Sequence, residues 1–193
     1  MNLYLRLLLI WFRNRGQEKH MLDHRADSTF RVWPNDIDAF GHMNNGRYLQ
    51  IMDVARVEWM LQTPVANTIR QQRWAPLLGG GVIRFRHSLK LAQRYSVHTR
   101  LLGWDTRWFY LEHSFRDRIG RCVAVGVTRA GLRRSGQWVP ADEVMHFVEP
   151  GTTSPLLPAH ILDWNELEEQ VYRHGAGRRQ LPQRSVRFSG LQS

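Results

Sequence analysis

The sequence predicts an α+β fold in which an antiparallel sheet of about five strands is wrapped around one long helix. Three observations lead to this prediction. Apolar side chains recur at helical spacing along residues 48–60 and cover so much of the helix circumference that the helix is expected to be largely buried. From Val82 onward apolar and polar residues alternate, which is the period of a strand with one buried face. A chain of 193 residues, 42% of them hydrophobic, can bury both elements in one domain.

The first two expected elements lie on either side of a polar motif. Residues 28–33 alternate apolar and polar side chains and are stopped by Pro34, which predicts a short first strand. The long helix follows the polar motif at residues 36–48 and is limited by Pro64. No regular element is predicted between Pro64 and the glycines at 79–81.

Four further strands are predicted in the rest of the domain. They are expected at residues 82–90, 96–103, 107–116 and 121–131. Residues 118–120 supply a turn between the last two strands. Prolines are frequent from Pro150 onward, and a separate helix is expected at residues 163–173.

Three regions follow from this pattern. The central domain is predicted at residues 28–148, after an apolar segment with its connector at 1–27 and before an extension at 149–193 that carries a short helix and a basic tail. The tail, residues 174–193, has little apolar content and is expected to be mobile.

The N-terminal run Leu3–Phe12 is apolar apart from Arg6. It has about half the length that a membrane-spanning helix needs, and no small-residue cleavage site of a signal peptide follows it. Two interpretations stay open. The segment is either an interfacial helix that gives peripheral membrane contact or an extra helix packed on the domain or on a dimer partner.

Charge and cysteine content narrow the choice of partners and location. The formal net charge is +10, and all but Lys19 and Lys90 of the basic residues are arginines. The charge is dispersed and no aromatic-interleaved basic motif is present, so we expect no nucleic-acid partner. Cys122 is the only cysteine, which excludes an intrachain disulfide and a cysteine-based metal site. We expect no metal, no cofactor and a cytoplasmic location.

The motif DIDAFGHMNNGRY, residues 36–48, stands where the long helix begins. A helix start exposes unpaired backbone N–H groups and the positive end of the helix dipole, which can polarise a carbonyl or hold an oxyanion. A carboxylate beside it adds a base or a nucleophile, and together these groups could hydrolyse a thioester. Alternatively, Asp38 makes only local turn bonds and Asn44 or Asn45 only caps the helix.

These residues resemble the D-x-D-x-x-G-H-x-N-N-x-x-Y signature of hot-dog thioesterases, the 4-hydroxybenzoyl-CoA thioesterase-like superfamily. They are also similar to a segment of plant acyl carrier protein thioesterases, and HMNNGRYL resembles the branch called thioesterase superfamily member proteins. The resemblance covers residues 28 to about 148. It implies the hot-dog fold and an acyl-CoA thioesterase, with an acyl carrier protein thioester as the other substrate. It also implies a homodimer or a dimer of dimers with sites at the interface.

Carried over by position, the resemblance implies that Asp38 is the catalytic carboxylate, as nucleophile or general base, and that Asp36 supports the turn. The other matched positions are expected to bind substrate or to organise the helix entrance: Gly41, His42, Asn44, Asn45 and Tyr48. His42 is either a participant or a hydrogen-bonding strut. Phe40 stands where the plant enzymes have a catalytic-network asparagine, which favours a mechanism of Asp38 and helix dipole alone.

Other charged residues leave alternatives open. Arg84, Arg86 and Lys90 are expected on one face of a strand, where they bind the phosphates of CoA or simply face solvent. Asp53 and Glu58 lie further along the helix. Three roles stay open for them: a second carboxylate of the site, an ion pair with Arg56, or a position facing a dimer partner.

The alternative to an enzyme is a non-catalytic acyl-binding or membrane-associated hot-dog module. Phe40 and the apolar N-terminal segment favour this alternative. Turnover of acyl-CoA separates it from the thioesterase.

Overall fold

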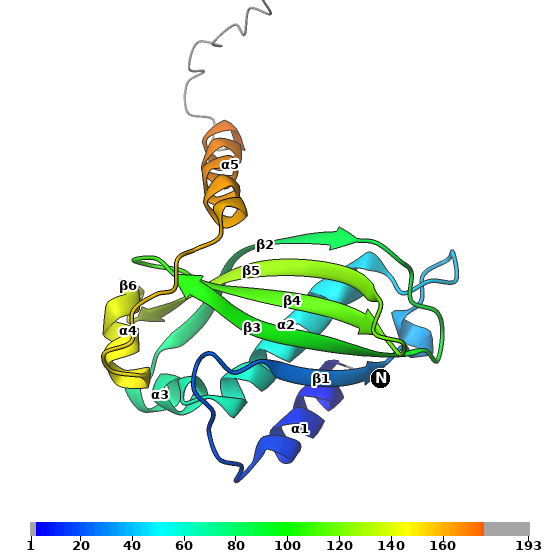
Figure 1. Ribbon diagram of the computed structural model, residues 1–193, viewed down its shortest axis with the longest axis horizontal. Helices are drawn as coiled ribbons and strands as arrows, with labels where there is room; N and C mark the ends of the chain where they lie inside the picture. Colours follow the sequence, from blue (N-terminus) through cyan, green and yellow to red (C-terminus); the bar gives the residue numbers. More distant parts are fainter. Residues whose placement is uncertain (1–2, 176–193) are drawn as a thin grey trace, which may run out of the picture. The chain divides into compact units, whose positions relative to one another are not determined.

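The computed structural model describes residues 3–175, which fall into two compact units divided between Leu156 and Leu157. In the first unit an antiparallel sheet curls around one long helix (Figure 1). This arrangement confirms the α+β hot-dog fold expected from the sequence. In the second unit the expected helix is α5, Ala159–Gly175. Most of the expected mobile tail, residues 176–193, lies outside the described residues.

The central helix is α2, Asn45–Gln62. Its buried side chains lie on more than one side of the helix, as the sequence predicts: Tyr48, Ile51, Met52, Val54, Ala55, Glu58 and Trp59. The helix lies so close to the sheet at Gly126 that a Cβ built there would stand 2.6 Å from Met52 Cε. Glycine at this position therefore permits the close packing of α2 on the sheet.

The sheet has six strands in the order β1-β3-β4-β5-β2, with the short β6 paired to β5. All neighbours are antiparallel. The strands are β1 Ala26–Arg31, β2 Ala75–Phe85, β3 Arg94–Trp104, β4 Phe109–Asp117, β5 Cys122–Arg134 and β6 Gln137–Val139. β2 and β1 form the two edges, and β2 is the longer edge, with most of its residues exposed.

Two hydrophobic clusters fill the space between α2 and the sheet. The first surrounds the N-terminal half of the helix, where Tyr48 and Met52 pack near Phe115 of β4. The second surrounds the C-terminal half, where Trp59 joins Leu111 of β4. Two further helices, α3 Val65–Gln72 and α4 Ala141–Val148, close this second end.

The N-terminal segment forms helix α1, Leu3–Asn14, which packs against α2 (Figure 1). Two ion pairs fix it to buried carboxylates: Arg6 with Asp36, and Arg13 with Glu58. Both carboxylates are at most 1% exposed. Of the interpretations of this segment, an extra helix packed on the domain is therefore what the structure shows for α1.

The other face of α1 is apolar and exposed. It carries Tyr4, Leu5, Leu8, Leu9, Trp11 and Phe12, which are 44–77% exposed. None of the helices within residues 3–175 is long and apolar enough to cross a bilayer.

Several expected boundaries were wrong. The strand expected at 82–90 is β2, which starts at Ala75 and includes the glycines at 79–81, because a bulge after Leu78 absorbs the break in alternation. It ends at Phe85, because the next two backbone N–H groups, of Arg86 and His87, both donate to Val123 O. The helices α3 and α4 and the strand β6 were not predicted.

Candidate functional site

A tight turn leads into α2 and holds the aspartate of the motif. The Asp38 N–H donates to His42 O at 2.9 Å, and the Gly41 N–H donates to Asp38 O at 3.1 Å. On either side of the turn, Ile37 and Met43 form a β-bridge. Gly41 has φ of +77°, a conformation that suits glycine. Its position in the motif is thus explained by the turn.

The Asp38 carboxylate is fixed through only one of its oxygens. Oδ1 accepts hydrogen bonds from the backbone N–H groups of Phe40 at 2.9 Å and His42 at 3.3 Å. The local turn bonds expected for an aspartate in this position are therefore present. Oδ2 accepts no hydrogen bond from the described part of the chain, so it can act on a bound molecule.

The first turn of α2 is capped by one of the two asparagines. Asn44 Oδ1 accepts the Gly46 N–H at 2.8 Å, and the Asn44 N–H donates to Asp36 O at 2.8 Å. The backbone N–H of Asn45 has no partner among the residues described. Asn44 is thus the cap, and Asn45 supplies the unpaired donor at the positive end of the helix dipole.

Asp36 stabilises this turn from beneath. It is 1% exposed, and its Oδ2 accepts the Trp33 N–H at 2.9 Å and pairs with Arg6 of α1. Arg47 of α2 lies 3.6 Å from the other oxygen. The structural role expected for Asp36 is met, and helix α1 contributes to it.

Asp38 lies at an open cleft of about 570 Å³ at the start of α2. Its lining is Asp38, Phe40, His42, Met43, Asn45, Tyr48, Phe85, Arg86, His87 and Ser88. The structure brings together five of the residues named from the sequence as site candidates: Asp38, His42, Asn45, Tyr48 and Arg86. Gly41 and Asn44 belong to the adjoining turn and cap and do not line the cleft.

Some lining residues were not foreseen. Met43 belongs to the motif itself. Phe85, His87 and Ser88 reach the cleft because residues 85–89 run beside the motif, where His42 bridges Lys90 and the Met43 N–H donates to Leu89 O. No local pattern in the sequence indicates this pairing. Phe40, noted before only as a departure from the plant enzymes, is 85% exposed at the tip of the turn.

Tyr48 and His42 differ in how they are held. Tyr48 is 2% exposed and packs against Phe85 and Phe115, each with ring centroids 5.1 Å away. Burial raises the pKa of its hydroxyl, although a backbone hydrogen bond from Leu89 acts in the opposite direction. The His42 ring lines the cleft and makes no hydrogen bond within residues 3–175, and its role as participant or strut stays a prediction.

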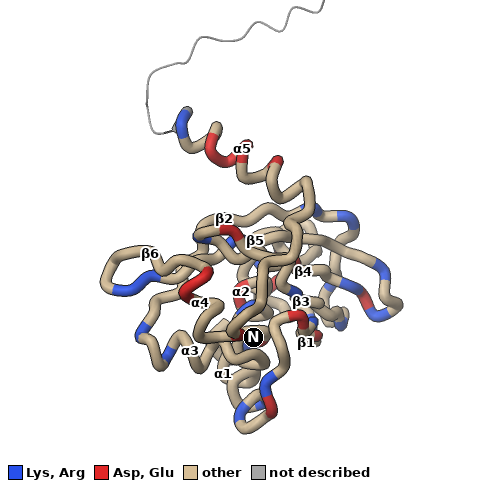
Figure 2. Tube along the Cα trace, turned by 60° about the vertical axis from the view of Figure 1, so that its left-hand side comes forward, with Lys and Arg blue, Asp and Glu red and all other residues tan. Residues whose placement is uncertain are grey.

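The three basic candidates are not on one strand face. Arg84 is the only one within β2, while Arg86 and Lys90 follow its end. Of the three, Arg86 alone lines the cleft. Figure 2 shows that Lys and Arg are spread over several elements of the first unit.

The other helix carboxylates lie away from the cleft. Asp53 pairs with Arg56 at 2.7 Å, as one of the expectations had it. Glu58 does not pair with Arg56 and instead accepts hydrogen bonds from Arg13 and Ser28. Among the described residues no cluster of His, Cys, Asp and Glu is suited to hold a metal ion.

The sequence matches the family model of the thioesterase-like superfamily over residues 32–164. It is 37% identical over 150 residues to Protein THEM6 of Xenopus laevis, a match that covers 76% of this chain and 71% of that protein. Against the proteins of the same name from Drosophila melanogaster and Danio rerio, the match spans 49% and 42% of their lengths.

The solved structures that share the fold include YbaW and SAV2348. YbaW, a probable thioesterase from Escherichia coli, aligns with a TM-score of 0.59 at 16% identity and covers 64% of this chain and 96% of its own. SAV2348 from Staphylococcus aureus, solved in complex with CoA, aligns with a TM-score of 0.56 at 13% identity and covers 75% of this chain and 96% of its own.

Proposed function

Because the chain belongs to the thioesterase-like superfamily, we propose that it hydrolyses acyl thioesters of coenzyme A to the free acid and CoA. The observation that carries this proposal is the position of two groups at one cleft. The Asp38 carboxylate and the unpaired N–H of Asn45 both lie at the start of α2. A carboxylate and an oxyanion donor are the parts that this hydrolysis requires.

In the proposed reaction the thioester carbonyl oxygen accepts the Asn45 N–H at the positive end of the α2 dipole. Asp38 Oδ2 either attacks the carbonyl carbon or takes a proton from a water molecule that attacks it. The negative charge that develops on the carbonyl oxygen is stabilised by the helix start. The C–S bond then breaks and the CoA thiolate takes up a proton. If water was the nucleophile, the acid is released at this point; if Asp38 was the nucleophile, a water molecule then hydrolyses the anhydride between Asp38 and the acyl group, which releases the acid and restores the carboxylate.

Arg86 is the proposed contact for a CoA phosphate, because it is the basic residue that lines the cleft. Lys90 lies next to the cleft through its β-bridge to His42. Arg84 lies further back on β2, and we keep both as secondary candidates. The CoA complex of SAV2348 supports the choice of CoA as the thiol carrier. The side chains of His42 and Tyr48 are proposed to contact the acyl end.

The test is thiol release by the wild-type protein and the variant Asp38→Asn across short, long and aromatic acyl-CoAs. We expect kcat to fall at least about 100-fold in the variant, because an amide can act neither as base nor as nucleophile. The melting temperature should stay near that of the wild type, because the amide oxygen of the substituted side chain can still accept the two N–H bonds of the turn.

Asp53→Asn is the matched control, since Asp53 is a half-exposed carboxylate of α2 outside the cleft. It should keep wild-type turnover. Turnover retained by Asp38→Asn would contradict the assignment. If Arg86 binds phosphate, Arg86→Ala should raise KM with little change in kcat, whereas Arg84→Ala should change KM less.

We further propose that the active form is a homodimer, or a dimer of dimers, joined along β2. This strand is an edge of the sheet with one side unpaired in the single chain. It is long and carries exposed apolar residues, among them Val82 and Phe85. Such an edge is a template for strand pairing with a second copy. Because Phe85 also lines the cleft, this dimer would place the cleft near the interface.

Membrane association through α1 is a second candidate function, carried by its exposed apolar face. Flotation of the protein with anionic phospholipid vesicles tests it. Leu8→Glu together with Phe12→Glu should abolish flotation, while Met21→Glu, an exposed apolar position outside α1, should not.

A further inference from the structure

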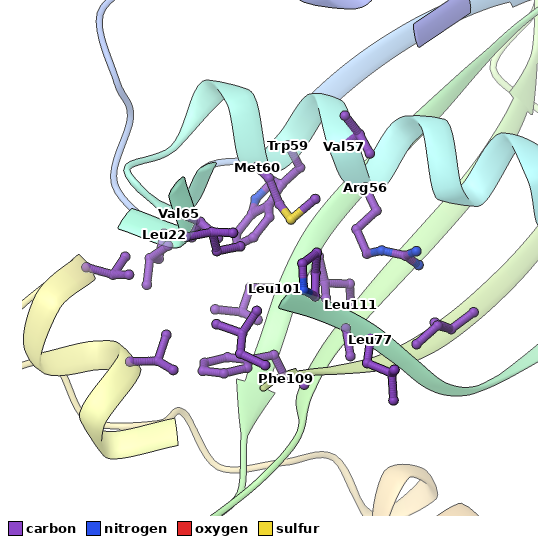
Figure 3. A pocket seen from close by; sticks show the side chains of 18 of the residues that line it. Leu22, Arg56, Val57, Trp59, Met60, Val65, Leu77, Leu101, Phe109 and Leu111 are labelled. Atoms are coloured by element: carbon purple, nitrogen blue, oxygen red, sulfur yellow. The ribbon is translucent and has the colours of Figure 1, made fainter. Parts of the chain in front are cut away.

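A second cavity, of about 180 Å³, lies between the C-terminal half of α2 and the sheet. Helices α3 and α4 contribute Val65, Ile69, Val144, Met145 and Val148 to its wall. From the sheet, Leu101 and Phe109 point toward Trp59 and Met60 of α2 (Figure 3). The lining is almost wholly aliphatic and aromatic, so an apolar ligand is the kind that fits it.

This cavity is separate from the Asp38 cleft. The two share no lining residue. On α2, the nearest lining residues of the two sites are Tyr48 and Arg56, which lie eight positions or about 12 Å apart along the helix. Between them Met52 is fully buried against Gly126, where even an added Cβ would have no room. Met52 therefore stands between the Asp38 cleft and this cavity beneath α2.

Arg56 is the only charged residue of the lining, and it is incompletely bonded. Its Nη2 donates to Asp53 at 2.7 Å. Its Nη1 is buried and has no hydrogen-bond partner within the described residues. A buried N–H group of a guanidinium without an acceptor is costly. Arg56 descends from α2 beside Leu111 at one side of the cavity (Figure 3), where an oxygen of a ligand could supply that acceptor.

The neighbouring titratable group adds no charge. His113 of β4 is fully buried and lies between the hydroxyls of Thr99 and Thr128, at 3.0 Å each. Burial, helped by the charge of Arg56, lowers the pKa of His113 to about 3. His113 is therefore neutral near pH 7. The charge at this end of the cavity comes from Arg56 and from Asp53, which is half-exposed.

We propose that this cavity is a second ligand site, which takes the hydrocarbon chain of an aliphatic monocarboxylic acid whose carboxylate accepts a hydrogen bond from Arg56 Nη1. An apolar cavity of about 150 Å³ accepts benzene, so a volume of this order holds roughly six to eight carbon atoms. Octanoate is the probe of matching size. The site does not depend on hydrolysis at Asp38.

Methionine methyl groups locate the ligand without altering either site. Met60 and Met145 line the cavity, and Met43 lines the Asp38 cleft. In wild-type protein labelled with ¹³C at the methionine methyls, octanoate should shift the Met60 and Met145 signals in a saturable way and leave Met43 unchanged. Asp38→Asn should give the same result. A shift at Met43 alone, or at none of the three, would overturn the proposal.

Two variants test the parts of the site by the same titration. Arg56→Gln should weaken octanoate binding about tenfold and leave binding of 1-octanol unchanged, because only the carboxylate uses the charge. Leu101→Trp should fill the cavity and abolish the Met60 and Met145 shifts with both ligands. Val65→Phe is a second variant that fills the cavity, for use if Leu101→Trp does not fold. If Arg56→Gln weakened the binding of octanoate and of 1-octanol equally, Arg56 would not recognise the carboxylate, and the proposal would be contradicted.

Discussion

At the scale of single residues, His113 couples stability to pH. Its pKa in the folded protein, about 3, lies below the value of about 6.5 expected in the unfolded chain, because burial disfavours the charged ring. Between these values the unfolded state binds a proton that the folded state does not. The contribution of His113 to stability is thus fully present above about pH 6.5 and is lost as the pH falls toward 3.

Lowering the pH from 7 to 5 should reduce the unfolding free energy of the wild type by about 2 kcal/mol more than it reduces that of His113→Gln. Urea unfolding of both proteins at the two pH values measures this difference. His146→Gln, which removes an exposed histidine of α4, is the control and should behave as the wild type. Equal pH sensitivity of His113→Gln and wild type would show that His113 titrates normally.

The cap of α2 is a second effect at this scale. Asn44→Ala removes the acceptor of the Gly46 N–H and should lower the unfolding free energy by about 1 kcal/mol. Asn45→Ala should cost less, because Asn45 is not the cap. Thermal unfolding of the two variants separates them, and an equal loss would count against Asn44 as the cap.

At the scale of elements, α1 is fixed to the domain through Arg6, which is 3% exposed. Arg6→Met leaves the buried Asp36 with only Arg47, at 3.6 Å, as a cationic partner. The expected loss of unfolding free energy is about 3 kcal/mol. Arg25→Met breaks an exposed pair with Asp27 and should cost less than about 1 kcal/mol.

A double-mutant cycle checks the origin of this loss. Asp36→Asn should reduce the cost of Arg6→Met, because no buried charge is then left without its partner. Chemical denaturation of the four proteins gives the coupling free energy. Strictly additive losses would mean that Arg6 acts by packing alone.

The elements also show how far the sequence could predict this structure. α2 and β3–β5 were predictable, since apolar spacing alone specifies them. α3 and α4 have eight residues each, too few for a periodic pattern to stand out. The boundaries of β2 failed because a bulge at its start and two N–H groups sharing one acceptor at its end interrupt the alternation.

The same limits apply to the candidate site. Asp38, His42, Asn45 and Tyr48 were found because they stand in one contiguous motif. The residues after Phe85 were missed, because they reach the cleft only through the pairing of distant segments. The ion pair of Glu58 with Arg13 spans 45 positions, and no local pattern predicts such a partner.

At the scale of the whole molecule, the free edge β2 predicts assembly. Sedimentation velocity should give a dimer or a dimer of dimers for the wild type. Val82→Lys, which places a charge on the exposed edge, should shift the protein toward the monomer. Ile119→Lys, at an exposed turn between β4 and β5, is the control and should leave the assembly unchanged. A monomeric wild type would contradict the proposed interface.

The ion pairs of α1 have a practical consequence for anyone who prepares a shortened form of this protein. The family match begins at residue 32, and a truncation there keeps Asp38 and α2 but removes α1 and β1. Asp36 and Glu58 would then lack the arginines Arg6 and Arg13, and the core would lose Ile10 and Phe30. We expect such a fragment to be recovered insoluble or partly unfolded. Its lack of turnover would therefore report on preparation of the sample and say nothing about the chemistry of the intact protein.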